Sequence, residues 1–129
     1  MGERKLPRPT DGELAILRVL WERGASTVRQ VLEELSQSRP TGYTTALKLL
    51  QIMTEKGLVL RDESQRTHVY RARLTEGQTQ RQLVKHLLER AFGGSAQKLV
   101  VQALATKKAS RKELDEIRRL LDEIEGDSK

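Results

Sequence analysis

Apolar residues in the first part of the chain recur at helical spacing, in three stretches that short polar segments separate. Thr10 followed by Glu13 is the signature of a capping box, which predicts that the first helix begins beside this pair. Ser26 or Thr27 can cap the second helix, and the third helix is expected over about residues 43–56. The pattern therefore predicts three consecutive helices joined by short turns.

The hydrophobic period shortens after the third helix. Two β-prone stretches, residues 58–61 and 67–73, flank a polar tip and predict a β-hairpin. Strict alternation assigns the following residues to its inner face: Leu58, Leu60, His68, Tyr70 and Ala72. Three helices followed by a hairpin are typical of the winged helix-turn-helix fold, so residues 1–75 are predicted to form a winged-helix DNA-binding domain.

A second helical unit is predicted over residues 76–129. Gly93–Ser95 interrupts its apolar pattern, and Ser110 with Glu113 marks another capping box. The apolar positions expected to hold two copies together are Leu83, Leu87, Leu88, Leu99, Val100, Leu104, Leu114, Ile117, Leu121 and Ile124. Short helices bury little on their own, so we predict a homodimer, with folding back onto the N-terminal domain as the alternative. The expected fold class is mainly α with a small β-hairpin wing: a winged helix-turn-helix plus a C-terminal helical dimerisation unit.

Composition sets broad limits on function. The 129 residues carry a formal net charge of +6, which favours anionic partners and makes nucleic acid the first candidate. On charge alone, a basic protein without such a partner is equally open. Residues 1–76 hold 13 Lys/Arg against 10 Asp/Glu and residues 77–129 hold 11 against 8, so each part has a net charge of +3. DNA binding must therefore depend on the local placement of charges.

Several kinds of chemistry are not indicated by the sequence. Cysteine is absent, which excludes disulfides and thiolate metal sites, and no nucleotide-binding or catalytic motif is present. The first residues lack the apolar region of a signal peptide and no apolar run approaches membrane length, so we expect a cytoplasmic protein without membrane insertion. We expect no enzyme activity, no cofactor and no metal. His68 is expected to fill the inner face of the hairpin, and His86 to lie on an exposed or interfacial helix face.

The third helix has an unusual polar side. Thr44, Lys48 and Gln51 lie together on it, Thr45 flanks them, and the only acid is Glu55 at the far end. The third helix of a winged helix enters the major groove, where threonine, lysine and glutamine side chains can bond base edges or phosphates. This face is therefore predicted to read DNA.

The chain also resembles a known family. Five segments carry the resemblance, in this order: "RPTDGELAILRVLWERG", "STVRQVLEEL", "TGYTTALKLLQIMTEKGLV", "RTHVYRA" and "FGGSAQKLVVQAL". They resemble the penicillinase-repressor family, which includes the BlaI, MecI and CopY types. The resemblance implies a sequence-specific transcriptional repressor that binds an inverted-repeat operator in double-stranded DNA as a homodimer. By position, the residues that match the family's DNA contacts are Tyr43, Thr44, Thr45 and Lys48 on the recognition helix, Thr27 and Arg29 on the supporting helix, and Arg66 at the wing tip.

Three departures from the family pattern change what the resemblance implies. The copper-responsive branch ends in a cysteine cluster, which this chain lacks, so copper sensing by thiolates is excluded. The β-lactam-responsive branch is cut by a membrane sensor protease at an Asn-Phe bond, where this chain has Gln102-Ala103. Ile52 occupies a position where many relatives carry a basic residue. A sensor protease is therefore a possible partner rather than an implied one.

Two other classes stay open at this point. One is a ligand-sensing winged-helix regulator of another type, with a small molecule between the dimerisation helices. The other is a winged helix that contacts only protein and does not bind DNA. The second class has no need of a recognition helix whose polar face is free of acids near its start.

Overall fold

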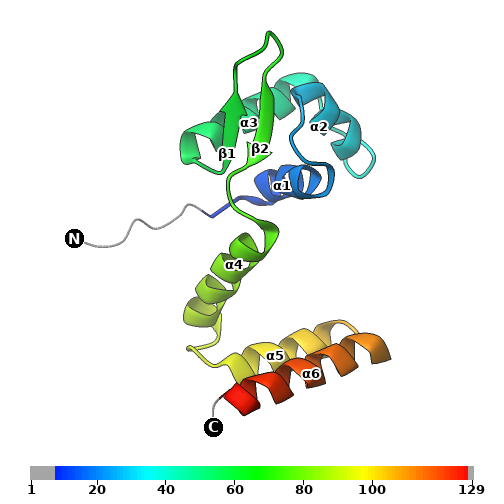
Figure 1. Cartoon of the computed structure of the whole chain (residues 1–129), viewed down its shortest axis with the longest axis vertical. Helices are drawn as coiled ribbons and strands as arrows, with labels where there is room; N and C mark the ends of the chain where they lie inside the picture. Colours follow the sequence, from blue (N-terminus) through cyan, green and yellow to red (C-terminus); the bar gives the residue numbers. More distant parts are fainter. Residues whose placement is uncertain (1–7, 128–129) are drawn as a thin grey trace, which may run out of the picture. The chain divides into compact units, whose positions relative to one another are not determined.

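In the computed structural model, which describes residues 8–127, three helices and a two-stranded antiparallel sheet are followed by three further helices (Figure 1). The elements are α1 (Asp11–Arg23), α2 (Val28–Leu35), α3 (Tyr43–Lys56), β1 (Val59–Asp62), β2 (Val69–Ala72), α4 (Glu76–Ala91), α5 (Ala96–Thr106) and α6 (Arg111–Asp127). The predicted fold class, a mainly α chain with a hairpin wing, is confirmed. Contacts divide the chain into two compact units, the first ending at Val84 and the second beginning at Lys85. This division lies inside α4, later than residue 75, and buried Thr79 on α4 belongs to the first unit.

The first two helices begin where their capping residues place them. The Thr10 side chain accepts a hydrogen bond from the Glu13 amide at 3.2 Å, and the Glu13 carboxylate accepts one from the Thr10 amide at 2.9 Å. Thr27 and Gln30 make the same reciprocal pair at the start of α2. Each pair satisfies amides that would otherwise lack partners at a helix start. Of the two caps that the sequence allowed for α2, the structure therefore uses Thr27.

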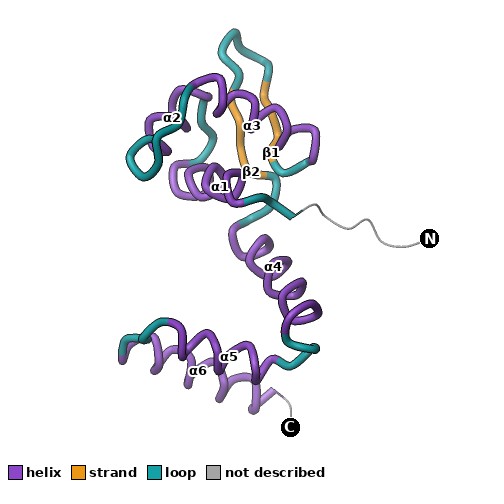
Figure 2. The backbone as a smooth tube through the Cα atoms, turned by 180° about the vertical axis from the view of Figure 1, so that it is seen from behind, coloured by secondary structure: helices purple, strands orange, loops and turns teal. Residues whose placement is uncertain are grey.

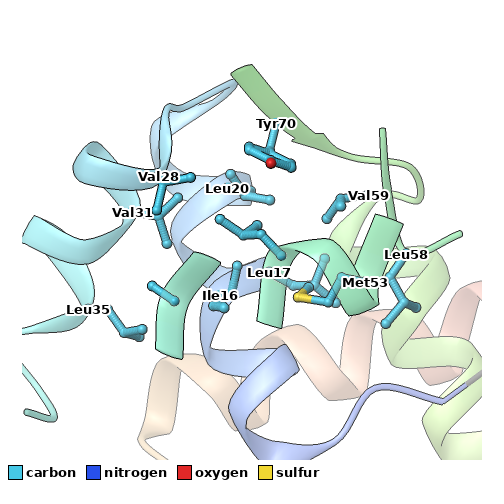
Figure 3. Close-up of a cluster of buried hydrophobic side chains, with 12 residues drawn as sticks. Ile16, Leu17, Leu20, Val28, Val31, Leu35, Met53, Leu58, Val59 and Tyr70 are labelled. Atoms are coloured by element: carbon cyan, nitrogen blue, oxygen red, sulfur yellow. The ribbon is translucent and has the colours of Figure 1, made fainter. Parts of the chain in front are cut away.

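The core of the first unit lies where the three helices meet the hairpin (Figure 3). Its buried members are Ile16, Leu17, Leu20, Val28, Val31, Leu35, Ala46, Leu50, Met53, Leu58, Val59 and Tyr70. Burial of a large apolar side chain stabilises a fold by roughly 1.5–3 kcal/mol. The third helix places one face in this core and ends at Gly57, whose φ of 81° closes the left-handed C-terminal turn. The opposite face of α3 is thereby held outward.

The hairpin differs in register from the sequence prediction. Val59 pairs with Ala72 and Arg61 pairs with Tyr70, so Val59 rather than Leu60 shares the inner face with Tyr70. Leu60 is exposed, which makes its assignment to the inner face wrong. His68 is also exposed, because regular pairing begins only after it and alternation does not extend to it. Leu58 and Tyr70 are buried as expected, and Ala72 packs against the core.

A short backbone bridge ties the hairpin to the turn before α2. The Ser26 amide donates to the Tyr70 carbonyl at 2.9 Å, and the Tyr70 amide donates to the Ser26 carbonyl at 2.8 Å. Ser26 is fully buried there, and its side chain donates to the Gly24 carbonyl. The wing is therefore held against the start of α2 by main-chain hydrogen bonds as well as by packing.

The second unit is built from the end of α4 together with α5 and α6, and α6 runs back along α5 (Figure 2). Ser95 caps α5, and Ser110 with Glu113 forms the expected capping box before α6. None of the described residues of α5 or α6 is buried. The large apolar residues that are exposed in this unit are Leu87, Val100, Val101, Leu104, Leu120, Leu121 and Ile124.

Candidate nucleic-acid interface

A groove with a volume of about 540 Å³ opens between the starts of α2 and α3 and the hairpin. We refer to it as the wing groove. It is lined by Thr27, Val28, Arg29, Tyr43, Leu47, Arg66, Thr67, His68 and Tyr70. Val28 and Tyr70 are buried and also belong to the core, so the groove is formed by the folded body of the first unit. Four of its residues, namely Thr27, Arg29, Tyr43 and Arg66, were predicted from the sequence to contact DNA.

The charge in the wing groove has one sign. Arg29 comes from α2 and Arg66 from the hairpin, and none of the described residues that line the groove is acidic. Guanidinium groups bind phosphate through paired, charge-assisted hydrogen bonds. The groove therefore presents cationic side chains that can bind phosphate, although the whole chain is only moderately basic.

The acids of the hairpin tip are engaged with neighbouring groups. Asp62 accepts a hydrogen bond from the Ser64 amide at 2.9 Å, and this bond is the main reason that the pKa of Asp62 lies below its usual value. Glu63 pairs with the Arg61 side chain at 2.7 Å. Neither carboxylate lines the wing groove.

The start of α3 lies beside the groove and lacks a side-chain cap. Its N-cap residue is Gly42, which makes no side-chain hydrogen bond to the helix, in contrast to Thr10 and Thr27 at the other two helices. The amides of a first helical turn have no partners within the helix and attract anions. At α3 they are available to an incoming group, and exposed Tyr43 occupies the first position of the helix.

The predicted reading face of α3 is exposed. Thr44, Thr45, Lys48 and Gln51 are all exposed, while the opposite side of the helix is buried in the core. The four residues do not line the wing groove. Their expected contact with DNA remains a prediction. The structure shows that these side chains are not needed to close the fold.

An ion pair joins α1 to the end of α3. The Lys56 ammonium lies 3.0 Å from both oxygens of the Glu13 carboxylate. Burial by itself raises the pKa of Glu13, but hydrogen bonds from the Thr10 amide and Lys56 more than offset this, so the pKa is lowered. Although Glu13 is only 1% exposed, its contacts with Thr10 and Lys56 favour the charged form of the carboxylate. The sequence had indicated Glu13 only as a capping residue.

Five residues of the groove were not among the predicted contacts, and two of these five, Thr67 and His68, are exposed. His68 had been assigned to the inner face of the hairpin, yet it lines the wing groove beside Arg66. The sequence does place His68 directly after Arg66 and Thr67, at the end of the polar tip, and this position could have indicated that it lines the groove. His86 lies on α4 and is partly exposed.

A second candidate surface is the apolar side of the C-terminal unit. Of the residues predicted to hold two copies together, Leu87, Val100, Leu104, Leu121 and Ile124 are exposed, whereas Leu83, Leu88, Leu99, Leu114 and Ile117 are partly buried. Exposed Val101 and Leu120 extend the surface and were not predicted. Large exposed apolar patches mark interaction sites in proteins.

Residues 8–127 give no sign of a metal site or a membrane span. No group of three or more His, Cys, Asp or Glu side chains in this range is placed to hold a metal ion. Within the same residues, no helix combines the length and the apolar character needed to cross a membrane.

Comparison with known proteins identifies relatives along most of the chain. A family model described as "Penicillinase repressor" matches residues 9–123. The "Transcriptional regulator BlaI" of Mycobacterium tuberculosis is 36% identical over 128 residues, covering 95% of this chain and 88% of the relative. The "Penicillinase repressor" of Bacillus licheniformis is 24% identical over 120 residues, covering 93% of this chain and 94% of the relative.

Solved structures resemble the first unit. The solution structure of the DNA-binding domain of the repressor BlaI has a TM-score of 0.50 and 26% identity, covering 57% of this chain and 90% of that one. The monomeric form of B. licheniformis BlaI in complex with the blaP half-operator has a TM-score of 0.50 and 25% identity, covering 58% of this chain and 92% of that one.

Proposed function

The chain belongs to the penicillinase-repressor family, and we propose that it is a sequence-specific transcriptional repressor that binds operator DNA. The observation that carries this proposal is the wing groove, which has two arginines and no acid among its lining residues and lies beside an uncapped helix start. One similar structure is a complex with a half-operator, which supports the same proposal. A repressor works where its operator is, which fits the cytoplasmic location expected from the sequence.

The two surfaces of the first unit have different tasks in this proposal. Phosphate contacts position a protein on DNA, whereas contacts with base edges specify the sequence. Thr27, Arg29 and Arg66 hold a phosphate backbone in the wing groove. Thr44, Thr45, Lys48 and Gln51 on α3 enter the major groove, where a glutamine can bond adenine and a lysine can bond guanine. Tyr43 lies between these two sets of contacts.

The test is a selection of duplexes from a random pool with the full-length protein. We expect the enriched duplexes to share an inverted repeat, because two copies of the chain would present two reading helices. Specific affinity is expected at about 10⁻⁸ M or tighter at moderate salt. Equal affinity for selected and scrambled duplexes would contradict the proposal and favour a winged helix that contacts only protein.

Two arginine variants show whether the wing groove is the phosphate site. Arg29→Ala and Arg66→Ala should each reduce the slope of log affinity against log salt by about 0.9 for every phosphate that the arginine neutralises in the wild type. Arg118→Ala is the matched control, because Arg118 lies on α6 and makes an exposed pair with Asp115. The control should retain the wild-type slope. Unchanged slopes in both groove variants would remove the groove from the interface.

The homodimer is proposed from the apolar side of the C-terminal unit. Leu104 and Val101 on α5 and Leu121 and Ile124 on α6 are each between 40% and 54% exposed, although they are large and apolar. An obligate interface of this kind would bury on the order of 2,000 Å² or more. A second copy of the chain brings an identical apolar surface, and it also supplies the second reading helix that an inverted repeat needs.

We also propose that a membrane sensor protease of the β-lactam type does not cut this chain efficiently between Gln102 and Ala103. Gln102 and Ala103 are exposed within α5, and the Gln102 carbonyl accepts a hydrogen bond from the Thr106 hydroxyl at 2.6 Å. We expect a protease that requires Asn-Phe to cut poorly here. The check is to incubate the protein with membranes from induced host cells and to measure fragment masses. A clean cut between Gln102 and Ala103 would contradict this expectation.

A further inference from the structure

His68 is held in a defined place on the wall of the wing groove. Regular pairing of the hairpin begins at the next residue, where Val69 lies opposite Asp62. Two residues after His68, the amide and carbonyl of Tyr70 are both bonded to Ser26. The His68 side chain is exposed and lines the groove together with Arg29 and Arg66. An imidazole therefore shares with two guanidinium groups a site that has the properties of a phosphate cleft.

The charged and titratable residues that line the groove with His68 come from each element around it. The helix α2 contributes Arg29, α3 contributes the phenol of Tyr43, and the hairpin contributes Arg66 and the buried phenol of Tyr70. No carboxylate is present among these described neighbours. Within residues 8–127, none of the ion pairs involves His68. A proton on His68 would thus place a third cation in a groove whose lining residues include no carboxylate.

We propose that His68 contacts a DNA phosphate as an imidazolium, so that operator binding takes up protons and strengthens as the pH falls. This proposal rests on the proposed function, because it needs DNA in the wing groove. A phosphate bound in the groove favours a positive charge on the imidazole. The complex then holds more protons than the free protein. Affinity must fall as the pH rises through the range in which imidazoles titrate, about pH 5 to 8.

The chain offers a matched control for this histidine. The only other histidine is His86, which lies on α4 in the second unit and does not line the groove. His68→Gln keeps a hydrogen-bond donor but cannot take up a proton. His68→Lys carries a positive charge across the whole range. Because His68 is exposed, both substitutions leave the core untouched, and a thermal melt of each variant verifies the fold.

The experiment measures the affinity of the full-length protein for the duplex selected above, at pH 6, 7 and 8 and constant ionic strength. We expect the wild type to bind roughly tenfold more tightly at pH 6 than at pH 8. His68→Gln should bind with nearly the same affinity at pH 6 and pH 8. Its affinity should equal that of the wild type only near pH 8. His68→Lys should bind tightly at every pH, and His86→Gln should follow the wild type.

A second measurement distinguishes a phosphate contact from an indirect effect of pH. The salt slope of the wild type should be steeper at pH 6 than at pH 8, by about 0.9 for each additional phosphate that the protein neutralises. The salt slope of His68→Gln should be the same at pH 6 and at pH 8. The proposal is overturned if the wild type shows no pH dependence, or if His68→Gln retains it. Equal binding of selected and scrambled duplexes by the wild type at every pH would instead overturn the proposed function.

Discussion

The two units of the chain use the same kind of sequence pattern with opposite results. The helices of the first unit bury their apolar residues, so that Ile16, Val31 and Leu50 have no exposed surface. The helices α5 and α6 have equally regular apolar positions, yet Leu121 and Ile124 remain more than half exposed. Amphipathic spacing shows which face of a helix is apolar, but not what covers that face. The first unit covers its apolar faces itself, whereas Leu121 and Ile124 of the second unit stay open to solvent in the single chain.

Several contacts that are distant in sequence explain why the first unit closes. Ser26 bridges to Tyr70, and Lys56 pairs with Glu13. The Trp21 indole donates to the Leu74 carbonyl at 3.0 Å, which ties α1 to the segment that leads into α4. These bonds join the helices to one another and to the hairpin. A core of this kind is expected to be stable without a partner.

The largest effect on stability is expected from a cavity in this core. Leu50→Ala should lower the free energy of unfolding by roughly 2–5 kcal/mol, because Leu50 is fully buried between the helices. Leu60→Ala is the matched control, since Leu60 is 39% exposed on the hairpin. Denaturant unfolding of the full-length chain measures the free energy of unfolding of both variants. Similar losses for the two variants would mean that the first unit is not closed as described.

The next effect concerns the open surface of the second unit. Leu104→Glu combined with Leu121→Glu should weaken self-association about a hundredfold, or roughly 2.8 kcal/mol, because two charges would enter the apolar interface. Unfolding of the first unit should remain unchanged. Leu60→Glu places the same charge at an exposed leucine outside this surface and should leave association intact. Sedimentation is the measurement, and a wild-type monomer at tens of micromolar would refute the homodimer.

A smaller effect is expected from the ion pair that joins α1 to α3. Glu13→Gln should cost about 1–2 kcal/mol, less than a fully buried pair, because solvent still reaches Lys56. The folded pKa of Glu13 lies below its ordinary value of 4.5, so its contribution is present above that value. The contribution is lost as the pH falls through the folded pKa. Stability of the wild type and Glu13→Gln should therefore converge in acid.

The exposed pair between Arg23 and Glu34 is the control for this prediction. Its two charged groups lie 3.2 Å apart, but both side chains are accessible to solvent. Glu34→Gln should change stability by less than about 1 kcal/mol. Unfolding measured from pH 3 to pH 7 compares the two variants. Equal costs near neutral pH would show that Glu13 is no more important than a surface charge.

The sequence predicted much of the first unit because local signals define its helices. Thr10 with Glu13 marked the start of α1, and α3 was expected over residues 43–56, as the structure has it. The hairpin was placed correctly, but its register was not. A strand of four residues is too short for alternation to determine which face is inward, and the bridge from Ser26 to Tyr70 joins distant segments.

The candidate site was only partly predictable for the same reason. Family resemblance brought Thr27, Arg29 and Arg66 together, and the structure places all three in one groove. The groove position of His68 depends on where β2 begins, which composition and spacing do not reveal. The ion pair of Glu13 joins residues 43 positions apart and has no local signal. The homodimer predicted from the apolar positions of the second unit stays a prediction.

The smallest change in stability is expected at α3, where a buried face and an open face belong to one helix. Thr44→Ala and Lys48→Ala alter exposed helical positions, and alanine is the best helix former, so stability should change by only a few tenths of a kcal/mol. Binding should respond much more strongly. Removing a hydrogen bond to a base edge costs about 1–3 kcal/mol, and Thr44→Ala should relax specificity at one or two base positions of the selected duplex.

Lys48→Ala should likewise relax specificity if Lys48 bonds guanine. If Lys48 instead binds phosphate, the substitution should weaken all sequences alike and reduce the salt slope. Binding isotherms measured beside thermal melts distinguish these cases. Wild-type affinity in both variants, with the fold intact, would mean that the exposed face of α3 does not contact DNA.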